Sequence, residues 1–451
     1  MQKFHYQNAE QLKKEIKELS VNIPFAEDLS PLANEVKINN KISPNSFAIL
    51  PMEGCDSNKD GSPSELVIRR YKRFAEGGAG FIWGEANAVS HEAKANELQM
   101  MITDENLESF KVFIKTLKKQ GLDKNGYEPL IISQLTHSGR YSRPVGHKST
   151  PLVPQRDPIL DSITGVVSDD SVVSDEYLAS LVAKYVHSAV LCQMAGYDGI
   201  DVKACHRYLL SELLASHTRP GVYGGSFENR ARLIFDIVEA IRLECGPDFI
   251  IASRFNVFDA HPYPYGFGCS KDNMWEFDEA EPIMLVEGLI KRGVNLLSNS
   301  AGNPYYIYPQ VTRPFDNSSL GVPEPDENQL VSIDRLFKFS EVIQKAAKDI
   351  PVIGNGYSYL RQYLANVGAA NIKLGRVKMI GLGRCAFAYP EAPSDVLNKG
   401  AMDVGKCCIS CSKCTQIMRD HGTTGCVVRD GEIYAPLARK FTHERIEREG
   451  K

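Results

Sequence analysis

The chain has no long hydrophobic run and no excess of basic charge. Its 451 residues contain no stretch approaching the roughly 18 consecutive apolar residues of a membrane-spanning helix, and the opening residues MQKFHYQNAE form no apolar signal segment. The formal net charge of −4 gives no basic excess of the kind that nucleic-acid-binding proteins carry. Internal repeats and low-complexity segments are also absent. These absences predict a cytoplasmic protein that binds neither membranes nor nucleic acid.

Cysteine is concentrated near the end of the sequence, where five of the eleven cysteines fall in one short segment. Cys408, Cys411, Cys414 and Cys426 have the spacing C-x2-C-x2-C-x11-C, which lets four thiolates converge on one metal centre. In a reducing compartment such thiols bind metal rather than form disulfides. Four sulfurs suit tetrahedral zinc as well as an iron–sulfur cluster, so the spacing leaves both metals open. We interpret Cys407 as a neighbour of this site and not as a ligand.

Short apolar runs alternate with longer segments of helical periodicity, the order expected of parallel strands joined by helices. Strands are predicted at 47–52, 81–86, 130–135, 199–203, 249–254, 294–298, 351–355 and 379–383. Amphipathic helices are predicted between them at 106–119, 175–194, 227–244, 279–291, 328–347 and 358–367. Eight strands separated in this way predict an α/β fold, a (β/α)8 TIM barrel.

The barrel pattern divides the chain into three predicted parts. Residues 1–40 form an N-terminal extension with a charged helix at 8–19, residues 41–400 form the barrel, and residues 401–451 form a cysteine-rich, metal-binding tail. Two long loops, 136–174 and 255–277, follow the third and fifth strands. In a barrel such loops cover the catalytic face.

Polar residues gather where the predicted strands end, which is where barrels carry out their chemistry. Gln134, His137 and Arg140 follow the third strand, Lys203, His206 and Tyr208 follow the fourth, and Arg254 ends the fifth. Two glycine-rich segments, IGNGYS and GLGR, follow the seventh and eighth strands. Barrels often hold phosphate at this place through backbone N–H groups, so these segments and Arg384 predict a phosphate site.

Several longer strings are specific enough to indicate a family. They are ILPM (49–52), GFIWGEA (80–86), QLTHSGR (134–140), AGYDGIDVKACHRYLL (195–210) and YGGSFENR (223–230). With these strings the chain resembles the old yellow enzyme family of flavin-dependent ene-reductases, and its cysteine segment is similar to that of the 2,4-dienoyl-CoA reductase-like branch. The resemblance covers roughly residues 40–430.

The resemblance implies an FMN cofactor across the top of the barrel and an activated alkene as the small-molecule substrate. The residues that match the family's flavin-ring contacts are Pro51, Met52, Ala86, Gln134 and Arg254, and those that match its phosphate contacts are Gly356, Gly383 and Arg384. Tyr208 matches the tyrosine that protonates the substrate α-carbon, while Lys203 and His206 match the pair that binds the activating carbonyl oxygen.

Three residues depart from the family pattern near this predicted site. One is Arg207, which stands where the family has a glycine. Lys203 replaces the first histidine of the usual His-x-x-His or His-x-x-Asn motif, which leaves the substrate open among a dienoyl thioester, an enone and an unsaturated acid. Glu53 stands where the family has a threonine or cysteine beside the flavin. A carboxylate there would disfavour the anionic reduced flavin unless it pairs with a cation or points away from the ring.

The cysteine tail also departs from the pattern, because its middle gap is one residue shorter than in the iron–sulfur branch. We still favour a [4Fe–4S] cluster, with zinc as the alternative. From its length we expect the chain to lack the C-terminal FAD and NAD(P) domains of that branch. Electrons would then come from NADH or NADPH directly, or from a separate electron-donor protein.

Two other functions remain open from the sequence. In the first, Lys203 forms a Schiff base in a flavin-free barrel lyase, since a lysine at the end of a barrel strand can condense with a carbonyl compound. In the second, the cysteine tail is a metal-responsive binding module on an inactive barrel.

Overall fold

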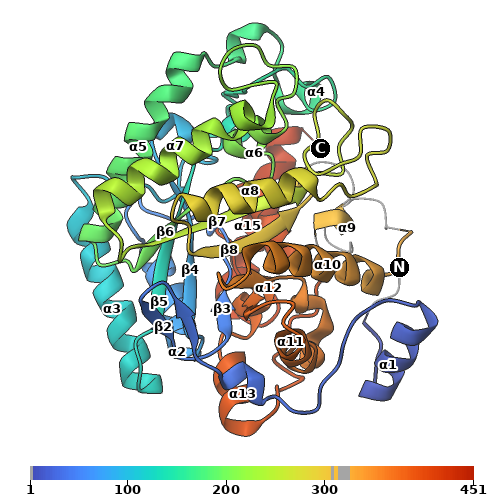
Figure 1. Ribbon diagram of the computed structural model, residues 1–451. Coiled ribbons are helices and arrows are strands. Elements are labelled where there is room, and N and C mark those ends of the chain that lie inside the picture. Colours follow the sequence, from blue (N-terminus) through green and yellow to red (C-terminus); the bar gives the residue numbers. More distant parts are fainter. Residues whose placement is uncertain (1–3, 306–308, 313–325, 451) are drawn as a thin grey trace.

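Eight parallel strands close into a barrel in the computed structural model, which describes residues 4–305, 309–312 and 326–450 (Figure 1). Around the barrel the order is β10-β3-β4-β5-β6-β7-β8-β9, so that each strand lies beside its neighbour in sequence and the last pairs with the first. The strands are β3 (Phe47–Ile49), β4 (Phe81–Ala88), β5 (Leu130–Thr136), β6 (Gly199–Val202), β7 (Ile250–Phe258), β8 (Leu296–Ala301), β9 (Val352–Gly354) and β10 (Met379–Leu382). The predicted (β/α)8 fold and its eight strands are confirmed.

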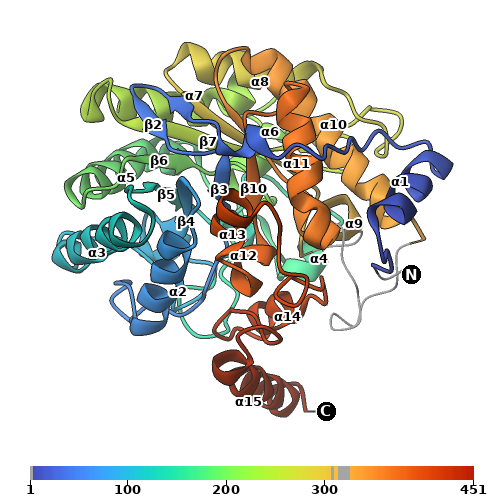
Figure 2. The same ribbon diagram turned by 90° about the horizontal axis from the view of Figure 1, so that it is seen from below.

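Helices connect these strands and form the outer layer (Figures 1 and 2). The main connecting helices are α2 (Glu65–Glu76), α3 (Leu107–Asn125), α5 (Asp175–Met194), α7 (Phe227–Cys245), α8 (Ala280–Lys291), α10 (Gln329–Ala347) and α11 (Leu364–Lys373). Shorter helices are α4 (Asp161–Thr164), α6 (Leu209–Leu214), α9 (Pro309–Thr312), α12 (Arg384–Ala388) and α13 (Ala392–Lys399). The inner faces of the long helices and the outer faces of the strands share one hydrophobic core.

The YGGSFENR string has a local structural role at the start of α7. The Ser226 side chain accepts a hydrogen bond from the Asn229 N–H and so caps the helix. Arg230 binds the carbonyl oxygens of Leu214 and Gly225 and pairs with Glu281 at the start of α8. The motif therefore fixes the connection between α6 and α7 and contributes no side chain to the cavity described below.

A short hairpin, β1 (Val36–Ile38) and β2 (Lys41–Ser43), closes the end of the barrel where the strands begin. Val36 and Ile38 pack in the same cluster as Phe81, Trp83 and other side chains that fill the barrel interior. The Lys41 ammonium group lies 2.9 Å from the carboxylate of Asp198, at the start of β6. The predicted domain boundary at residue 40 falls within this hairpin, and the division into three parts stays a prediction.

The remaining α-helices of the described chain lie near its two ends. The charged N-terminal helix is α1 (Ala9–Glu18), and the tail contains α14 (Lys413–Arg419) and α15 (Gly431–Glu449), which projects from the body (Figure 2). The predicted helix at 358–367 differs from the structure, in which a 3-10 segment (Tyr357–Tyr363) precedes α11. Arg361, with φ of +51°, interrupts the helical path there, so the α-helix begins at Leu364.

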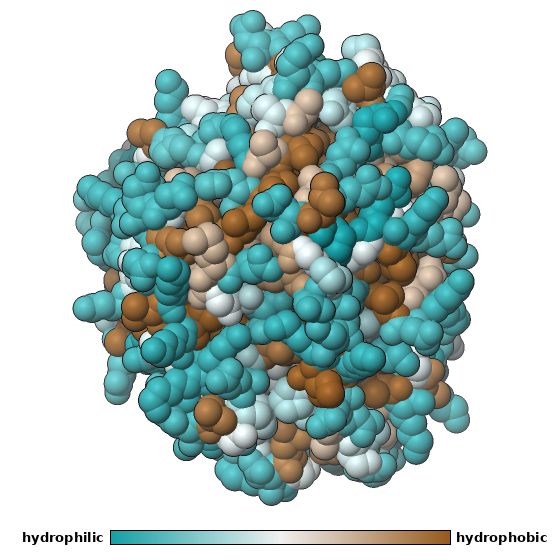
Figure 3. Space-filling model, turned by 60° about the vertical axis from the view of Figure 1, so that its left-hand side comes forward, coloured by the Kyte–Doolittle hydropathy of each residue, from teal (hydrophilic) through white to brown (hydrophobic). Residues whose placement is uncertain are grey.

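The face on the side of α3, α5 and α7 is mostly hydrophilic, with apolar side chains gathered in separate patches (Figure 3). Within the described residues, none of the helices has the length and apolar composition needed to span a bilayer.

Candidate active site

A cavity opens at the carboxyl ends of the barrel strands, with about 1040 Å³ of empty space counted out to solvent. Because parallel strands end at the same rim, side chains far apart in sequence meet there. Nine of the predicted catalytic and cofactor-binding residues line the cavity: Pro51, Met52, Gln134, Lys203, His206, Arg254, Gly356, Gly383 and Arg384. The structure brings these residues together, and the roles assigned to them stay predictions.

The other two predicted residues lie behind the cavity wall. Ala86 is buried in β4, in register with Gln134 of β5. Tyr208 is 1% exposed and is not among the lining residues, but its hydroxyl contacts Glu53 and Tyr305, which both line the cavity.

Gln134 is held in place by Asp201, a buried residue of β6 to which the sequence assigned no role. The Gln134 amide donates to Asp201 at 2.6 Å, and the Trp83 indole N–H donates to the same oxygen at 3.0 Å. The other Asp201 oxygen accepts from the backbone N–H of Arg254 at 2.8 Å. Burial raises the pKa of Asp201 to about 7 in spite of these donors. The sequence feature that could have indicated a role for Asp201 is its position as a carboxylate within an apolar strand.

Glu53 does pair with a cation. Its Oε1 lies 3.4 Å from the Lys203 ammonium group, and the Tyr208 hydroxyl donates to the same oxygen at 3.4 Å. The Lys203 ammonium also lies 3.9 Å from the centre of the Tyr208 ring, a cation–π contact. Lys203 is therefore the cation whose pairing with Glu53 would offset the effect of this carboxylate on a reduced flavin.

His206 is fixed by both its backbone and its ring. Its φ of +66° and that of Arg207, +60°, are in the left-handed region, which is costly for non-glycine residues and is retained where the surroundings hold it. The His206 N–H donates to the Asn256 side chain at 3.1 Å, and its Nε2 lies 3.1 Å from the Ser300 hydroxyl. His206 thus reaches the cavity in one orientation.

A second tyrosine, Tyr305, lines the cavity and contacts Tyr208. The hydroxyls of Tyr208 and Tyr305 lie 2.8 Å apart, and the rings are nearly parallel, at 10°. Burial is the main cause that raises the pKa of both phenols above their usual range, so both are neutral and carry a proton near pH 7. Tyr305 follows β8 in a loop, outside every motif that the sequence offered.

The polar residues after β5 divide between two environments. Of Gln134, His137 and Arg140, only Gln134 lines the cavity. His137 binds the Tyr177 hydroxyl at 2.7 Å, and burial lowers the pKa of its ring to about 4, so it is neutral. Arg140 is fully buried and pairs with Glu212 at 2.7 Å and Asp161 at 2.6 Å.

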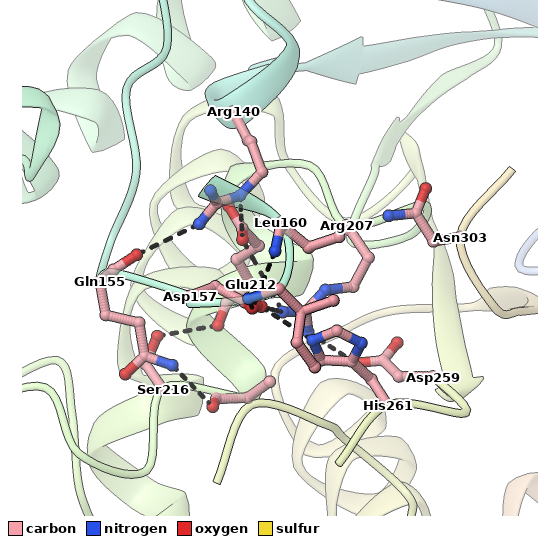
Figure 4. Close-up of polar contacts among 12 residues, drawn as sticks. Arg140, Gln155, Asp157, Leu160, Arg207, Glu212, Ser216, Asp259, His261 and Asn303 are labelled. Atoms are coloured by element: carbon pink, nitrogen blue, oxygen red, sulfur yellow. Dashed lines mark hydrogen bonds and ion pairs between the residues drawn. The ribbon is translucent and has the colours of Figure 1, made fainter. Parts of the chain in front are cut away.

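Arg140 belongs to a buried ion network beside the site (Figure 4). Arg207 pairs with Asp259 at 2.8 Å and lies 3.4 Å from Asp157, which also binds His261 at 2.9 Å. Members come from the loop after β5, from α6 and from the loop after β7. The network therefore fixes both long loops relative to the strand ends. It also accounts for Arg207, which directly follows His206.

The four predicted cysteine ligands line one small cavity in the tail, about 370 Å³ in empty volume, together with Arg384. Burial raises the pKa of the Cys414 thiol to about 12, while the Arg384 cation acts in the opposite direction. Cys407 is not among the lining residues, and its thiol donates to the Asp403 carbonyl oxygen at 3.3 Å. Across the described ranges, no three His, Cys, Asp or Glu side chains already stand at metal-ligand distances. The donor set fits a thiolate-bound metal, and the metal itself stays a prediction.

The larger cavity fits an anionic flavin nucleotide in two respects. The Arg254 Nε is buried and has no hydrogen-bond partner within the described part of the chain, which leaves a donor in the wall. A Cβ built on Gly383 would point into open space, so the backbone at this position is accessible to a ligand, with Arg384 beside it. Arg254 would hold the ring end and Gly383 with Arg384 the phosphate end.

The fold and the cavity define a class: a (β/α)8 barrel with its binding site at the carboxyl ends of the strands. A family model described as the NADH:flavin oxidoreductase / NADH oxidase family matches residues 32–268. The chain belongs to this family, which confirms the resemblance drawn from its motifs. Membership supports a flavin cofactor and a nicotinamide electron donor.

Individual relatives are more distant. The chain is 27% identical over 385 residues to an NADH oxidase of Thermoanaerobacter brockii, covering 84% of this chain and 52% of that protein. It is 26% identical over 413 residues to a cinnamate reductase of Clostridium sporogenes, covering 88% and 57%. The structure of a 2-naphthoyl-CoA reductase complex superimposes with a TM-score of 0.70 at 20% identity, over 92% of this chain and 58% of that one, and shows the shared fold. The chain spans about half the length of the curated relatives it matches.

Proposed function

We propose that the protein is an FMN-dependent ene-reductase, which reduces a C=C bond conjugated to a carbonyl or carboxyl group. The observation that carries this proposal is the meeting of Lys203 and His206 with the Gln134, Arg254 and Arg384 positions around one cavity. When bound, reduced FMN supplies a hydride to the β-carbon of the alkene.

The protein's own side chains complete the reaction. Lys203 and His206 bind the carbonyl oxygen and stabilise the negative charge that develops on it, which makes the β-carbon electrophilic. Tyr208 supplies the proton to the α-carbon. Because Tyr305 lines the cavity, Tyr208 does not, and their hydroxyls are in contact, the proton passes through the Tyr305 hydroxyl. One hydride and one proton together saturate the bond.

The electrons that reduce the flavin come from NADH or NADPH, or from a donor protein at the cysteine tail. Cys408, Cys411, Cys414 and Cys426 would hold a [4Fe–4S] cluster, with zinc as the alternative. Arg384 lines both the large cavity and the cysteine cavity, so the two sites are adjacent.

The surroundings of Lys203 favour this function over a Schiff-base lyase. Its amine contacts the Glu53 carboxylate and the face of the Tyr208 ring, an environment suited to an ammonium group. A Schiff base requires a neutral amine.

The first experiment is a spectrum of protein purified without oxygen, with iron, zinc and acid-labile sulfide analysis. We expect flavin absorption that bleaches with NADH or NADPH and recovers when benzylideneacetone, a simple enone, is added. A protein that takes up no added FMN, or one whose reduced flavin is not reoxidised by any activated alkene, would overturn the proposal.

A further inference from the structure

A second cavity adjoins the first and has no role in the reaction as proposed so far. Its empty volume is about 1000 Å³. Glu53, Tyr305 and Met418 line both cavities and so form a shared wall. The second cavity is otherwise built from the loops after β4 and β5 and from the end of α14, by Ala95, Asn96, Tyr141, Arg143, Leu160, Ile163, Thr164, Arg419 and His421, with Cys55 from the loop after β3.

Two arginine side chains give this second cavity positive charge. Arg143 and Arg419 both line it, and neither has a carboxylate within 4.0 Å among the residues that the structure describes. Among the described residues that line it, Glu53 is the one acidic side chain, and it contacts Lys203 of the first cavity. Among the described residues, the two guanidinium groups that line the cavity therefore have no carboxylate as an ion-pair partner.

The hydrogen bonds of these arginines leave donors available. Arg143 Nη1 lies 3.0 Å from His421 Nε2, while its Nε is buried and has no partner within the described chain. Arg419 Nη2 donates to the Pro304 carbonyl oxygen at 2.9 Å. Burial and the nearby Arg143 cation lower the pKa of His421 to about 4, so its ring is neutral and can accept from Arg143.

The same cavity also has aromatic and apolar lining residues, and one of them, Tyr305, directly follows Pro304, whose carbonyl oxygen binds Arg419. The Tyr141 and Tyr305 rings lie 4.5 Å apart, and Leu160 is fully buried behind the cavity. A flat apolar group fits against such rings, and a pair of guanidinium groups binds a carboxylate or phosphate through charge-assisted hydrogen bonds.

We propose that the second cavity binds an anionic group of the substrate that is separate from the carbonyl next to the reacting alkene. The substrate is then an unsaturated carbonyl compound with a flat apolar body and a remote carboxylate or phosphate. The apolar body crosses the shared wall beside Tyr305, and Arg143 and Arg419 bind the anion. This inference rests on the proposed ene-reductase function and narrows its substrate class.

The test compares two enones that differ in one charge: benzylideneacetone with a para-carboxylate and its methyl ester. In the wild-type protein the acid should have a KM at least about ten-fold lower, and the advantage should shrink with added salt because it is electrostatic. Arg419→Gln and Arg143→Gln should each raise the KM of the acid about 10- to 100-fold and leave that of the ester unchanged. Arg143→Lys, which keeps the charge, should recover part of the loss.

Lys148→Gln is the matched control, because it removes one positive charge from an exposed residue of the same loop that does not line the cavity. Calorimetry measures how tightly each protein binds the saturated acid. In Arg143→Gln and Arg419→Gln the affinity for this acid should fall by about the factor by which the KM rises. A para-phosphonate in place of the carboxylate distinguishes the two anions by which binds more tightly.

Other outcomes separate this inference from the function on which it rests. Equal KM values for acid and ester in the wild type would overturn the inference while the ene-reductase function stands. The inference is also overturned if the arginine variants have a raised KM for NADH and an unchanged KM for the acid, since the arginines would then bind the nicotinamide donor. If neither enone reoxidises a flavin that NADH has reduced, the proposed function itself fails.

Discussion

At the scale of single residues, two departures from the family pattern compensate each other. Lysine at position 203 adds a positive charge where the family has histidine, and glutamate at position 53 adds a negative charge where it has an uncharged residue. The structure places these two charges 3.4 Å apart. The two charges offset each other beside the cavity proposed for FMN, and Glu53 still accepts from Tyr208.

The proposed proton path through two tyrosines makes a prediction at the same scale. Tyr208→Phe and Tyr305→Phe should each slow alkene reduction about 100-fold, because either change removes one hydroxyl of the path. Flavin reduction by NADH should be unchanged, since it needs no proton from these phenols. Stopped-flow measurement of the two half-reactions checks this.

Tyr127→Phe is the control for this prediction, because the Tyr127 hydroxyl binds the Gly78 carbonyl oxygen at the opposite end of the barrel. If Tyr305→Phe has no effect while Tyr208→Phe slows the reaction, Tyr208 acts on the substrate directly. If Tyr208→Phe leaves alkene reduction unchanged, its role as proton donor is wrong.

The sequence could predict the residues that line the cavity from the strand ends, because position along a parallel strand fixes the rim on which a side chain lies. It could not predict Tyr305, Asp201 or Asn256 as parts of the site. Their positions depend on contacts between segments far apart in sequence, such as the 2.8 Å contact between the Tyr208 and Tyr305 hydroxyls. The hydrophobic periodicity of a sequence does not indicate such contacts.

At the scale of elements, α14 joins the tail to both cavities. The helix begins at Lys413, beside Cys414, and its Thr415 and Met418 line the first cavity, while Met418 and Arg419 line the second. A metal bound by the cysteines would therefore hold α14, which forms part of the wall of each cavity, in place.

This arrangement predicts that loss of the metal also weakens FMN binding. Cys414→Ser should remove most bound metal and weaken FMN binding about ten-fold or more, because α14 loses its anchor. Metal and sulfide analysis and an FMN titration check the two effects. Cys407→Ser, which changes a neighbouring thiol outside the cysteine cavity, should affect neither. Metal loss in Cys407→Ser with none in Cys414→Ser would show that the ligand set is wrong.

The long connecting helices could be predicted because each buries one apolar face against the barrel. The helix α15 could not, since Tyr434 is its one buried residue among those described, so that it buries no continuous apolar face. The break before α11 was missed for another reason. It depends on the backbone of Arg361, whose positive φ leaves no mark on hydrophobic periodicity.

At the scale of the whole molecule, buried charges fix the loops that cover the site. Arg207 and Asp157 are each 2% exposed or less, and they join the segment after β6 to the loop after β5. Asp259 extends the connection to the loop after β7. A buried charge that loses its partner is costly, so these loops keep one arrangement as long as the pairs are intact.

The network makes acid stability depend on Asp157. Hydrogen bonding from His261 and the positive charge of Arg207 outweigh burial and lower the pKa of Asp157 to about 2, from 3.8 for the free side chain. Since the folded-state pKa is the lower one, the carboxylate stabilises the fold above about pH 4 and loses this effect as pH falls toward 2. The difference corresponds to about 2 kcal/mol, of which about half is lost by pH 3.

Asp157→Asn should therefore lower the free energy of unfolding by about 2 kcal/mol at pH 7, and the gap to wild type should narrow by about 1 kcal/mol at pH 3. Urea unfolding at the two pH values measures this gap, and contributions from carboxylates common to both proteins cancel in it. Asp123→Asn, at an exposed carboxylate of α3, should show no such pH-dependent gap. A gap for Asp157→Asn that stays constant from pH 7 to pH 3 would mean that the loops are held by packing and not by this ion network.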